Sequence, residues 1–349
     1  MIATITFHWA TNYGAVIQAY ALQKWLLENG FNTEIIDYMP KRERFISFLV
    51  NIRDGKTKEL IKGLYLSRFR KKELKLSKKR FNKYTQLKEC AHAYSAVICG
   101  SDQIWNTYFT LKAEGKPTFS YFIDFVAPET RRISYASSFG TESLNEEFKT
   151  LIYPKLSMFN SLSVRENSAV SILNDIGIKA KVVCDPTLLL VANDYNKLLR
   201  VSTNRASDIF VYKLHNDLTC NQVSNYLSNK YKLKNNNPEK VLTLYEWLRC
   251  LRDSQIIITN SFHGIMMSLI FNTPFIAVLI RGSGMNDRIK TILSEVGLQN
   301  RIIDCFDTDS VEAIYQESID WIIVNDKLSI LRQRGIQFLN DALDGIQRK

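Results

Sequence analysis

One short stretch decides the fold of this 349-residue chain, and it runs Gln255-Ile256-Ile257-Ile258-Thr259-Asn260-Ser261-Phe262-His263-Gly264. Its apolar first half is typical of a buried strand, and residues 265–270 that follow it have the apolar composition of a helix. A histidine therefore stands where a strand turns into a helix. In an open α/β sheet that turn lies at the carboxyl edge, where ligands bind and where the helix presents free backbone N–H groups. The alternative is that His263 only fills the turn or caps its helix.

Apolar runs alternate with helical patterns in both directions from this turn, almost to the chain ends. Such alternation is typical of parallel sheets wound by helices, and it disfavours an all-β fold or a helix bundle. We therefore expect an α/β fold of two doubly wound, Rossmann-like domains facing a cleft, as in the glycosyltransferase-B arrangement. The domains are expected over residues 1–190 and 205–315. Residues 316–349 are expected to be helical, with apolar faces that need a docking surface, for which the N-terminal domain is a candidate.

The first domain is predicted to begin with strand Ile2–Phe7, helix Tyr13–Glu28 and strand Thr33–Tyr38. Its later strands are predicted at Tyr94–Cys99, Tyr121–Phe125, Arg132–Ser137, Ser161–Val164 and Lys181–Cys184, with helices at Glu146–Phe159 and Asn167–Ile176. In the second domain, strands are predicted at Ile209–Lys213, Gln255–Ile258, Phe275–Ile280 and Arg301–Ile303, with helices at Asp217–Leu227, Tyr245–Arg252 and Asp287–Val296.

The net charge of +11 is concentrated in one segment. Residues 41–83 contain sixteen Lys or Arg against four Asp or Glu, a local balance of +12, so the rest of the chain comes to about −1. Apolar residues such as Phe45, Phe48, Leu64 and Phe69 are interleaved with these charges. The composition predicts a basic helical insertion. It suits peripheral contact with an anionic membrane, and it equally suits a solvated helical excursion whose apolar face packs on its own domain.

Other features of the chain exclude several classes of protein. The six cysteines are scattered without a CxxC pair or a histidine at metal-ligand spacing, so we expect reduced thiols and no metal site. The N-terminus runs directly into an apolar strand pattern, and no apolar run is long enough to cross a bilayer. We therefore expect a cytoplasmic protein, with residues 41–83 as the candidate for contact with the inner face of the plasma membrane. No zinc-finger, RNP-like or helix-turn-helix pattern accompanies the charge, so nucleic acid is not an expected partner.

Three turns that follow predicted strands carry polar side chains. The first contains Asn12, Tyr13 and Gly14, the second contains Ser101, Asp102, Gln103, Trp105 and Asn106, and the third contains Asn260, Ser261, Phe262, His263 and Gly264. Helix capping alone explains Asn12 and the Ser-Asp pair. The second turn nevertheless holds more polar and aromatic side chains than a cap needs, which makes it a candidate binding site.

Arginines near these turns are candidates for binding a carboxylate or a phosphate. Arg165 ends a predicted strand and should point at the same sheet edge as Asp102; its alternative role is an ion pair with Glu166 or another neighbour. Arg281 and Arg288 flank a Gly-Ser-Gly loop around Ser283, a weak candidate for an anion-binding nest. The patterns of P-loop, dinucleotide-binding, zinc-protease and serine-hydrolase sites are absent. No second acid is marked as a partner of Asp102 for a two-carboxylate hydrolase.

Six motifs together resemble the polysaccharide pyruvyl transferase family. They are Asn12-Tyr13-Gly14 with Gln18-Ala19-Tyr20-Ala21-Leu22, Gly100-Ser101-Asp102-Gln103-Ile104-Trp105-Asn106, Ser134-Tyr135-Ala136-Ser137-Ser138-Phe139-Gly140, Ser163-Val164-Arg165-Glu166, Asp185-Pro186-Thr187-Leu188-Leu189-Leu190 and Ser261-Phe262-His263-Gly264. They occur in the family's order, and the resemblance extends from residue 1 to about residue 301. Residues 41–83 match no motif, which leaves the acceptor in question more than the reaction.

The resemblance implies transfer of a pyruvyl group from phosphoenolpyruvate to two hydroxyls of one sugar in a polysaccharide precursor, forming a cyclic ketal and releasing phosphate. It implies no metal and no organic cofactor. His263 would be the main acid or base, Arg165 would hold the donor's phosphate or carboxylate, and Asp102 would position or deprotonate an acceptor hydroxyl. The other residues expected to bind substrate are Asn12, Tyr13, Gly14, Ser101, Gln103, Asn260, Ser261, Phe262, Gly264, Arg281, Ser283 and Arg288.

Two other functions remain open at this level. A nucleotide-sugar glycosyltransferase would use the same two-domain architecture, because a fold does not fix a function. A non-enzymatic membrane or nucleic-acid binder would depend on residues 41–83. We favour a pyruvyl transferase whose basic segment brings it to lipid-linked sugar acceptors.

Overall fold

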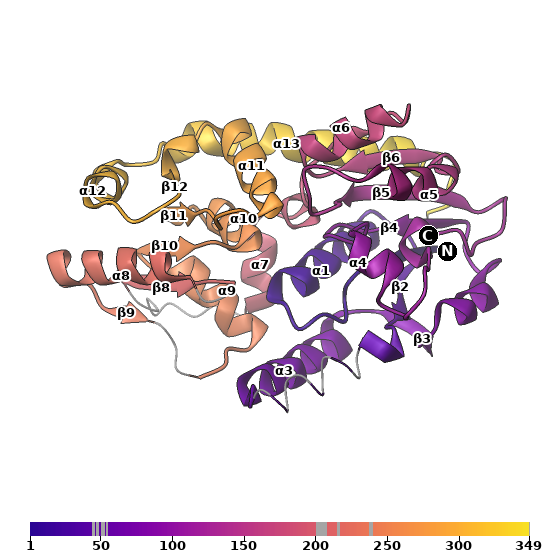
Figure 1. Cartoon of the computed structure of the whole chain (residues 1–349), viewed down its shortest axis with the longest axis horizontal. Helices are drawn as coiled ribbons and strands as arrows, with labels where there is room; N and C mark the ends of the chain where they lie inside the picture. The colour runs from indigo at the N-terminus through magenta and orange to yellow at the C-terminus, as the bar shows by residue number, and fades with distance from the viewer. Residues whose placement is uncertain are drawn as a thin grey trace. The chain divides into compact units, whose positions relative to one another are not determined.

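A computed structural model describes residues 1–43, 46, 49, 53, 55–199, 208–214, 217–236 and 240–348 of the chain (Figure 1). Two of the apolar residues in the basic segment, Phe45 and Phe48, lie outside the described residues, as do the first residues of the predicted second domain, 205–207. The chain divides into two compact units. The first comprises Met1–Leu189 with Leu331–Lys349, and the second comprises Leu190–Ile330.

The first unit is built on a seven-stranded parallel sheet in the order β3-β2-β1-β4-β5-β6-β7. Its strands are β1 Ile2–Ile5, β2 Thr33–Tyr38, β3 Leu76–Phe81, β4 Ala96–Cys99, β5 Arg131–Ser137, β6 Ser161–Val164 and β7 Lys181–Val182. The helices of this unit are α1 Tyr13–Glu28, α3 Thr57–Glu73, α4 Thr107–Leu111, α5 Glu146–Leu156 and α6 Asn167–Asp175. Strands β1 and β4 are buried along their whole length, as expected for strands covered on both faces by helices. The strand order reverses between β1 and β4, which is where ligands bind in sheets of this kind.

The second unit has a five-stranded parallel sheet in the order β12-β11-β10-β8-β9. Its strands are β8 Ile209–Tyr212, β9 Asn235–Asn236, β10 Ile256–Thr259, β11 Phe275–Val278 and β12 Ile302–Ile303. The helices are α7 Ala192–Leu199, α8 Leu218–Tyr231, α9 Leu244–Asp253, α10 Phe262–Phe271, α11 Asp287–Val296 and α12 Thr308–Gln316. The strand β10, predicted from the opening stretch, is the central strand, and the order reverses between it and β8.

The last helix, α13 Trp321–Ala342, contributes its second half to the first unit. The Phe338 ring lies 6.2 Å from the ring of Tyr135 on β5. Arg131 Nη1 donates hydrogen bonds to the carbonyls of Ala342 and Asp344, at 3.0 and 2.6 Å. Burial of aromatic surface and satisfied helix-end carbonyls therefore hold residues 331–344 on this unit.

The prediction of a basic helical insertion over residues 41–83 is wrong for the last part of the segment. Residues 41–43 and α3 are helical, but Leu76–Phe81 forms the edge strand β3. Its side chains at 78–80 are charged and exposed, which is typical of edge strands because charge there discourages pairing with other chains. Gln23 of α1 fixes the residue just before this strand, because its side chain bonds both the N–H and the carbonyl of Lys75 at 2.8 Å.

The predicted strand at Tyr121–Phe125 is also wrong. The segment forms a single 3₁₀ turn, Ser120–Phe122, and then Ile123 adopts a left-handed conformation with φ +55°. Its carbonyls are bonded by the buried guanidinium of Arg132, which donates to Ile123 and Val126 at 3.2 and 2.8 Å. An aromatic-rich segment has high strand propensity, but here burial of the rings and these side-chain hydrogen bonds determine its conformation.

Candidate functional site

The turn between β10 and α10 is fixed by hydrogen bonds of its own side chains. Thr259 Oγ1 donates to the carbonyl of Tyr212 on β8 and accepts from Ser261 N–H at 3.0 Å. Ser261 Oγ then accepts from Gly264 N–H at 3.3 Å and so caps α10. Because Ser261 is the cap, His263 lies in the first turn of the helix, and the alternative that His263 caps the helix is wrong.

Asn260 joins this turn to the loop that follows β8. Its Oδ1 accepts from Leu214 N–H at 2.6 Å and its Nδ2 donates to the Leu214 carbonyl at 2.8 Å. These two hydrogen bonds extend the pairing of β8 and β10 past Tyr212 and Thr259, the last paired residues of the two strands. Asn260 thus holds the carboxyl ends of the two strands between which the sheet order reverses. Its predicted contact with substrate stays a prediction.

Three side chains gather at the N-terminus of α10. The buried His263 ring lies 5.2 Å from the Phe262 ring at 81°, and Arg288 Cζ lies over the Phe262 ring at 5.5 Å from its centroid. Arg288 comes from α11 and is largely buried, with its Nε donating to the Met285 carbonyl at 3.3 Å. An imidazole and a guanidinium therefore lie close to the positive end of a helix, an environment that favours an anion.

The loop between β11 and α11 carries the remaining predicted residues of this unit. Ser283 Oγ accepts from Met285 N–H at 3.2 Å, and Asn286 bonds both the N–H and the carbonyl of Ile280 at 3.1 and 2.7 Å. Arg281 is exposed, next to Gly282 at φ +67°. The side-chain bonds close this loop on itself, and its predicted role as an anion-binding nest stays a prediction.

In the first unit, Asp102 follows β4 with a strained backbone at φ +81°. Such a conformation is uncommon outside glycine, although Asp tolerates it better than most residues. Its carbonyl accepts from Ser138 N–H at 3.1 Å, and its Oδ1 accepts from Gln103 N–H at 2.9 Å. The helix α4 is capped by Asn106 instead, so the alternative that Ser101 and Asp102 form its N-cap is wrong. Strain held by neighbouring contacts is a feature of functional turns.

The Arg165 guanidinium is surrounded by three carboxylates. Its Nη1 lies 2.9 Å from Asp185 Oδ2, its Nη2 lies 3.8 Å from Asp102 Oδ1, and its Nε lies 3.8 Å from Glu166 Oε2. Burial alone would lower the pKa of Arg165, but the charges of Asp185, Glu166 and Asp102 raise it above its ordinary value. The interpretation of Arg165 as an ion-pair partner of its neighbours is confirmed.

Ser101 connects Arg165 to the rest of this turn. Ser101 Oγ accepts from Arg165 Nη1 at 3.2 Å and donates to Asp185 Oδ2 at 3.0 Å. Its carbonyl accepts from Thr6 Oγ1 at 2.9 Å, and Thr6 in turn accepts from Gln18 Nε2 at 2.9 Å. The carboxyl ends of β1 and β4 are therefore joined by one buried polar network.

Asp185 belongs to one of the six motifs, but the sequence assigned it no role in the site. It is fully buried, and its second oxygen accepts from the N–H and the hydroxyl of Thr187 at 3.0 and 2.8 Å. The motif itself and the position after β7, at the carboxyl edge of the sheet, were the available signals. Its pairing with Arg165, twenty residues earlier, required the sheet order.

The remaining predicted residues of the first unit have clear local roles. Asn12 Oδ1 caps α1 by accepting from Ala15 N–H at 3.2 Å, so the capping interpretation is confirmed. The Tyr13 ring is buried, with Lys62 Nζ of α3 at 4.9 Å from its centroid. The Gln103 side chain packs against Gly140: a Cβ added to Gly140 would lie only 2.7 Å from Gln103 Cδ. Trp105 is fully buried in the core, stacked at 5.7 Å on Phe122, so the expectation that it is available for recognition is wrong.

Helix α3 of the basic segment packs on its own unit. Leu66 and Phe69 are buried, and the Phe69 ring lies 5.9 Å from the ring of Tyr20 on α1. Arg70 Nη1 lies 3.4 Å from each of the carbonyls of residues 8–10, and burial lowers the pKa of Arg70 to about 10, which leaves it charged at neutral pH. The basic segment thus supports the loop that leads into Asn12 and Tyr13.

The structure brings the predicted residues together in two groups, one in each unit. Ser101, Asp102 and Arg165 form the group in the first unit, and Phe262, His263 and Arg288 form the group in the second unit. No helix among the described residues is both long enough and apolar enough to span a membrane.

Comparison with known structures supports the fold assignment. The chain is similar to the UDP co-structure of MnaA from Staphylococcus aureus, with a TM-score of 0.54 and 13% identity over 100% of this chain and 98% of that one. It is equally similar to the UDP-GlcNAc 2-epimerase from Neisseria meningitidis bound to UDP-GlcNAc, with a TM-score of 0.54 and 10% identity over 98% of each chain. The corresponding values for the epimerase from Methanocaldococcus jannaschii are 0.51 and 11%, over 92% and 93%. At such identities the similarity concerns the fold alone, and the predicted α/β, glycosyltransferase-B-like class is confirmed.

A family model identifies the enzyme class. The model described as polysaccharide pyruvyl transferase matches residues 12–281, while no curated protein matches the chain. This match covers all six motifs and both groups of site residues except Arg288. The alternative of a non-enzymatic binder is therefore dropped, and the chain is a transferase that belongs to the polysaccharide pyruvyl transferase family.

Proposed function

We propose that this chain transfers a pyruvyl group from phosphoenolpyruvate to two hydroxyls of a sugar in a lipid-linked precursor of a cell-surface polysaccharide. The central carbon of phosphoenolpyruvate forms two C–O bonds to the acceptor oxygens, and its C–O bond to phosphate breaks. The two acceptor hydroxyls lose two protons in total: one balances the proton that turns the methylene carbon into a methyl group, and the other leaves on the released phosphate. The product is a cyclic ketal. The observation that carries this proposal is the gathering of His263 and Arg288 at the positive end of α10, beside Phe262.

The donor suits the second unit because phosphoenolpyruvate carries a phosphate and a carboxylate. The α10 N-terminus offers backbone N–H groups and a favourable dipole to one anionic group. Arg288 offers a guanidinium to the other. His263 lies in the same turn, and in this proposal it donates the proton to the methylene carbon.

Substitution of His263 tests this role. We expect His263→Asn to reduce phosphate release from phosphoenolpyruvate by about a hundredfold or more, the usual contribution of a positioned acid or base. The matched control is His92→Asn, because His92 lies on the surface and pairs with the exposed Glu129. A folded His263→Asn enzyme with the turnover of the control would remove His263 from the chemistry.

The first unit suits the acceptor. Of the three carboxylates around Arg165, only Asp102 has appreciable exposure, with 16% of its side chain accessible against 2% for Glu166 and none for Asp185. Asp102 is therefore the carboxylate that a ligand can reach, and we assign it the contact with an acceptor hydroxyl. We expect Asp102→Asn to raise the KM for the acceptor or lower kcat, with no change in the affinity for phosphoenolpyruvate measured by calorimetry. Weaker donor binding in this variant would contradict the assignment.

Arg165 fits a positioning role better than the donor clamp that the family pattern suggests. Three carboxylates already balance its charge, so a further anion beside it would meet net negative charge. We expect Arg165→Lys, which loses the planar fork, to lower kcat while leaving the KM for phosphoenolpyruvate unchanged. A raised KM for phosphoenolpyruvate with unchanged kcat would restore the clamp.

Peripheral membrane contact is proposed for the outward face of α3. Ile61 and Leu64 are 41% and 63% exposed there, and the exposed Lys58, Arg68, Lys71 and Lys72 surround them. A face of this composition suits an anionic bilayer, with each cation near the surface contributing about 1 kcal/mol. We expect flotation with phosphatidylserine vesicles at low salt, and its loss in the Ile61→Glu/Leu64→Glu variant. The control is Leu151→Glu/Met158→Glu, two exposed apolar residues elsewhere; equal flotation of both variants would contradict the proposal.

A further inference from the structure

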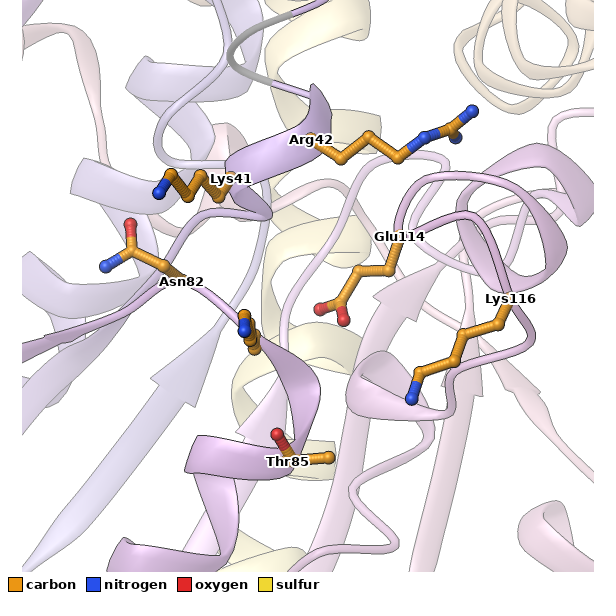
Figure 2. Close-up of a pocket in the computed structure, with 7 residues that line it drawn as sticks. Lys41, Arg42, Asn82, Thr85, Glu114 and Lys116 are labelled. Carbon is orange, nitrogen blue, oxygen red and sulfur yellow. The ribbon is translucent and has the colours of Figure 1, made fainter.

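A pocket lies in the first unit, and neither Asp102 nor Arg165 lines it. Its volume is about 450 Å³, and it is lined by Lys41, Arg42, Asn82, Lys83, Thr85, Glu114 and Lys116 (Figure 2). Lys41 and Arg42 follow β2, and Asn82 and Lys83 follow β3. The pocket therefore opens at the carboxyl ends of two parallel strands, the sheet edge at which α/β proteins bind ligands.

Backbone hydrogen bonds keep the two segments beyond these strands together. Met39 N–H donates to the Phe81 carbonyl and Lys41 N–H donates to the Asn82 carbonyl, both at 2.9 Å. Gln86 Oε1 accepts from Asn82 N–H and Lys83 N–H at 2.8 and 3.0 Å. The strand pairing thus extends past the sheet, and two walls of the pocket are built on it.

The third wall is the loop after α4, and it is held by Arg42 and Glu114. Arg42 Nη1 donates to the Lys112 carbonyl at 2.6 Å. Glu114 Oε1 accepts from Tyr38 Oη and from Tyr84 N–H, at 2.5 and 2.6 Å. Burial, with added effects of Tyr121 and Glu114, raises the pKa of Tyr38 far above its ordinary value, so the phenol stays protonated and keeps donating. Figure 2 shows Glu114 and Lys116 extending from this loop toward the segment that carries Thr85.

The charge of this pocket is positive and unbalanced. Lys41, Lys83 and Lys116 form no ion pair with any residue that the structure describes. Glu114, the acid of the lining, is stabilised by two uncharged donors. Like charges gathered at one site repel each other, and an anion bound among them removes that repulsion.

The lining chemistry points to a phosphate group. Lysine is a common phosphate binder that acts as a point charge, and Asn82 and Thr85 supply an amide and a hydroxyl. None of the described lining residues is aromatic, so stacking of a nucleobase is not supported. The volume lies within the range of small-ligand sites, about 300–1,000 Å³.

The pocket and Asp102 lie close enough for one ligand to reach both. Both lie at the carboxyl edge of the same sheet, and the strand order β3-β2-β1-β4 places two strand spacings between β2 and β4. At about 4.8 Å per strand, the two sites are separated by roughly 10–15 Å along the edge. A short saccharide with its phosphate at one end spans such a distance.

We propose that this pocket binds the phosphate or diphosphate group of the acceptor, while Asp102 contacts the sugar that is pyruvylated. The assignment to the acceptor rests on the proposed function. The binding of a phosphate group does not, because it rests on the pocket and its lysines.

The test compares binding of inorganic pyrophosphate to the full-length chain and to Lys83→Gln/Lys116→Gln, by calorimetry at low salt. We expect the variant to bind about tenfold more weakly or worse, a loss of ~1.4 kcal/mol or more. The control is Lys78→Gln/Lys88→Gln, which removes the same charge from exposed positions outside the pocket and should bind like the wild type. Equal affinity of the pocket variant and the wild type, or no binding by the wild type, would overturn the proposal.

Two further measurements distinguish a lipid-linked phosphate from a soluble one, and phosphate binding from the proposed pyruvyl transfer. Flotation of the wild type, but not of the pocket variant, with phosphatidylcholine vesicles containing a polyprenyl diphosphate would assign the pocket to a lipid-linked phosphate. Pyrophosphate binding without such flotation would assign it to a soluble glycosyl phosphate. In turnover, the variant should show a raised KM for the acceptor and an unchanged KM for phosphoenolpyruvate. A wild type that binds pyrophosphate but releases no phosphate from phosphoenolpyruvate with any acceptor would contradict the proposed function and leave the pocket standing.

Discussion

Gly264 shows at the residue scale how closely the turn before α10 is packed. A Cβ at this position would lie 2.6 Å from Thr259 Oγ1 and 3.2 Å from the ring of Tyr212. Thr259 cannot move away easily, because its hydroxyl bonds both Tyr212 and Ser261. The glycine therefore allows the helix to begin directly against the strands, and this close approach places His263 at the sheet edge.

We expect Gly264→Ala to lower the free energy of unfolding by about 1–3 kcal/mol, the usual cost of forcing extra volume into a packed site. Gly63→Ala, within α3, is the control, because the nearest described atom to its added Cβ, Thr11 Oγ1, would lie at an ordinary van der Waals distance of 3.8 Å. That substitution should raise stability by roughly 0.5–1 kcal/mol, since glycine is unfavourable in helices. Urea denaturation of both variants measures the difference, and the opposite order would refute this account of the turn.

Asp37 provides a prediction for the dependence of stability on pH. Its carboxylate lies between His8 Nε2 at 3.2 Å and Arg80 Nε at 2.7 Å. Burial alone would raise the pKa of Asp37, but the hydrogen bonds and charges of His8 and Arg80 lower it below its ordinary value of 3.8. A carboxyl whose pKa is lower in the folded state stabilises the fold above pH 3.8, and this stabilisation is lost as the pH falls through the folded pKa.

We therefore expect Asp37→Asn to be less stable than the wild type at neutral pH, with a difference that shrinks as the pH falls below 3.8. Urea titrations at several pH values measure it. Asp175→Asn serves as the control, because Asp175 is largely exposed and its pair with Lys149 contributes little. A difference that stays constant with pH would show that Asp37 does not act through its charge.

At the scale of elements, helix α13 has a defined contact with the first unit at Gly335. A Cβ added there would lie 2.8 Å from Cys184 Sγ and would also meet Tyr135 Oη. We expect Gly335→Ala to destabilise the protein by about 1–3 kcal/mol, although alanine is the better helix former. Gln333→Ala changes an exposed position of the same helix and should be neutral or slightly stabilising. Thermal unfolding of the two variants compares them, and equal midpoints would mean that this part of α13 does not pack tightly.

The basic segment shows how one stretch of sequence serves several purposes at the element scale. In α3, Leu66 and Phe69 are buried against the unit while Ile61 and Leu64 are exposed. The strand β3 completes the sheet edge, and Lys41 and Lys83, at the two ends of the segment, line the pocket shown in Figure 2. The excess of positive charge is therefore divided between an outward helix face and a concave site.

At the scale of the whole molecule, the fold is shared with proteins solved with UDP or UDP-GlcNAc, so ligand binding must separate the candidate functions. We expect phosphoenolpyruvate to raise the thermal midpoint and UDP-GlcNAc to leave it unchanged. At a hundred times its dissociation constant the donor would add about 2.7 kcal/mol of stability. Arg288→Met should weaken this protection, and the exposed Arg334 provides the control Arg334→Met. Protection by UDP-GlcNAc but not by phosphoenolpyruvate would favour a nucleotide-sugar enzyme instead.

The sequence by itself determined the elements whose signals are local. Helix α1, strands β2 and β6 and helix α11 occupy the predicted residues, because apolar periodicity and side-chain caps act within a few residues. The turn from β10 to α10, with His263 in the first helical turn, was predictable for the same reason. So was the fold class, since alternation of strand and helix patterns leaves few other arrangements.

The tertiary structure decided which distant groups become partners. Arg165 bonds Asp185 because β6 and β7 are neighbours in the sheet, and Trp105 is buried because the 120–123 segment folds over it. Leu76–Phe81 becomes a strand because an unpaired edge of β2 is available, although its composition suggested a helix. The pocket shown in Figure 2 likewise combines three segments that are adjacent only in space. Such contacts depend on strand order and burial, and no local pattern of residues encodes either.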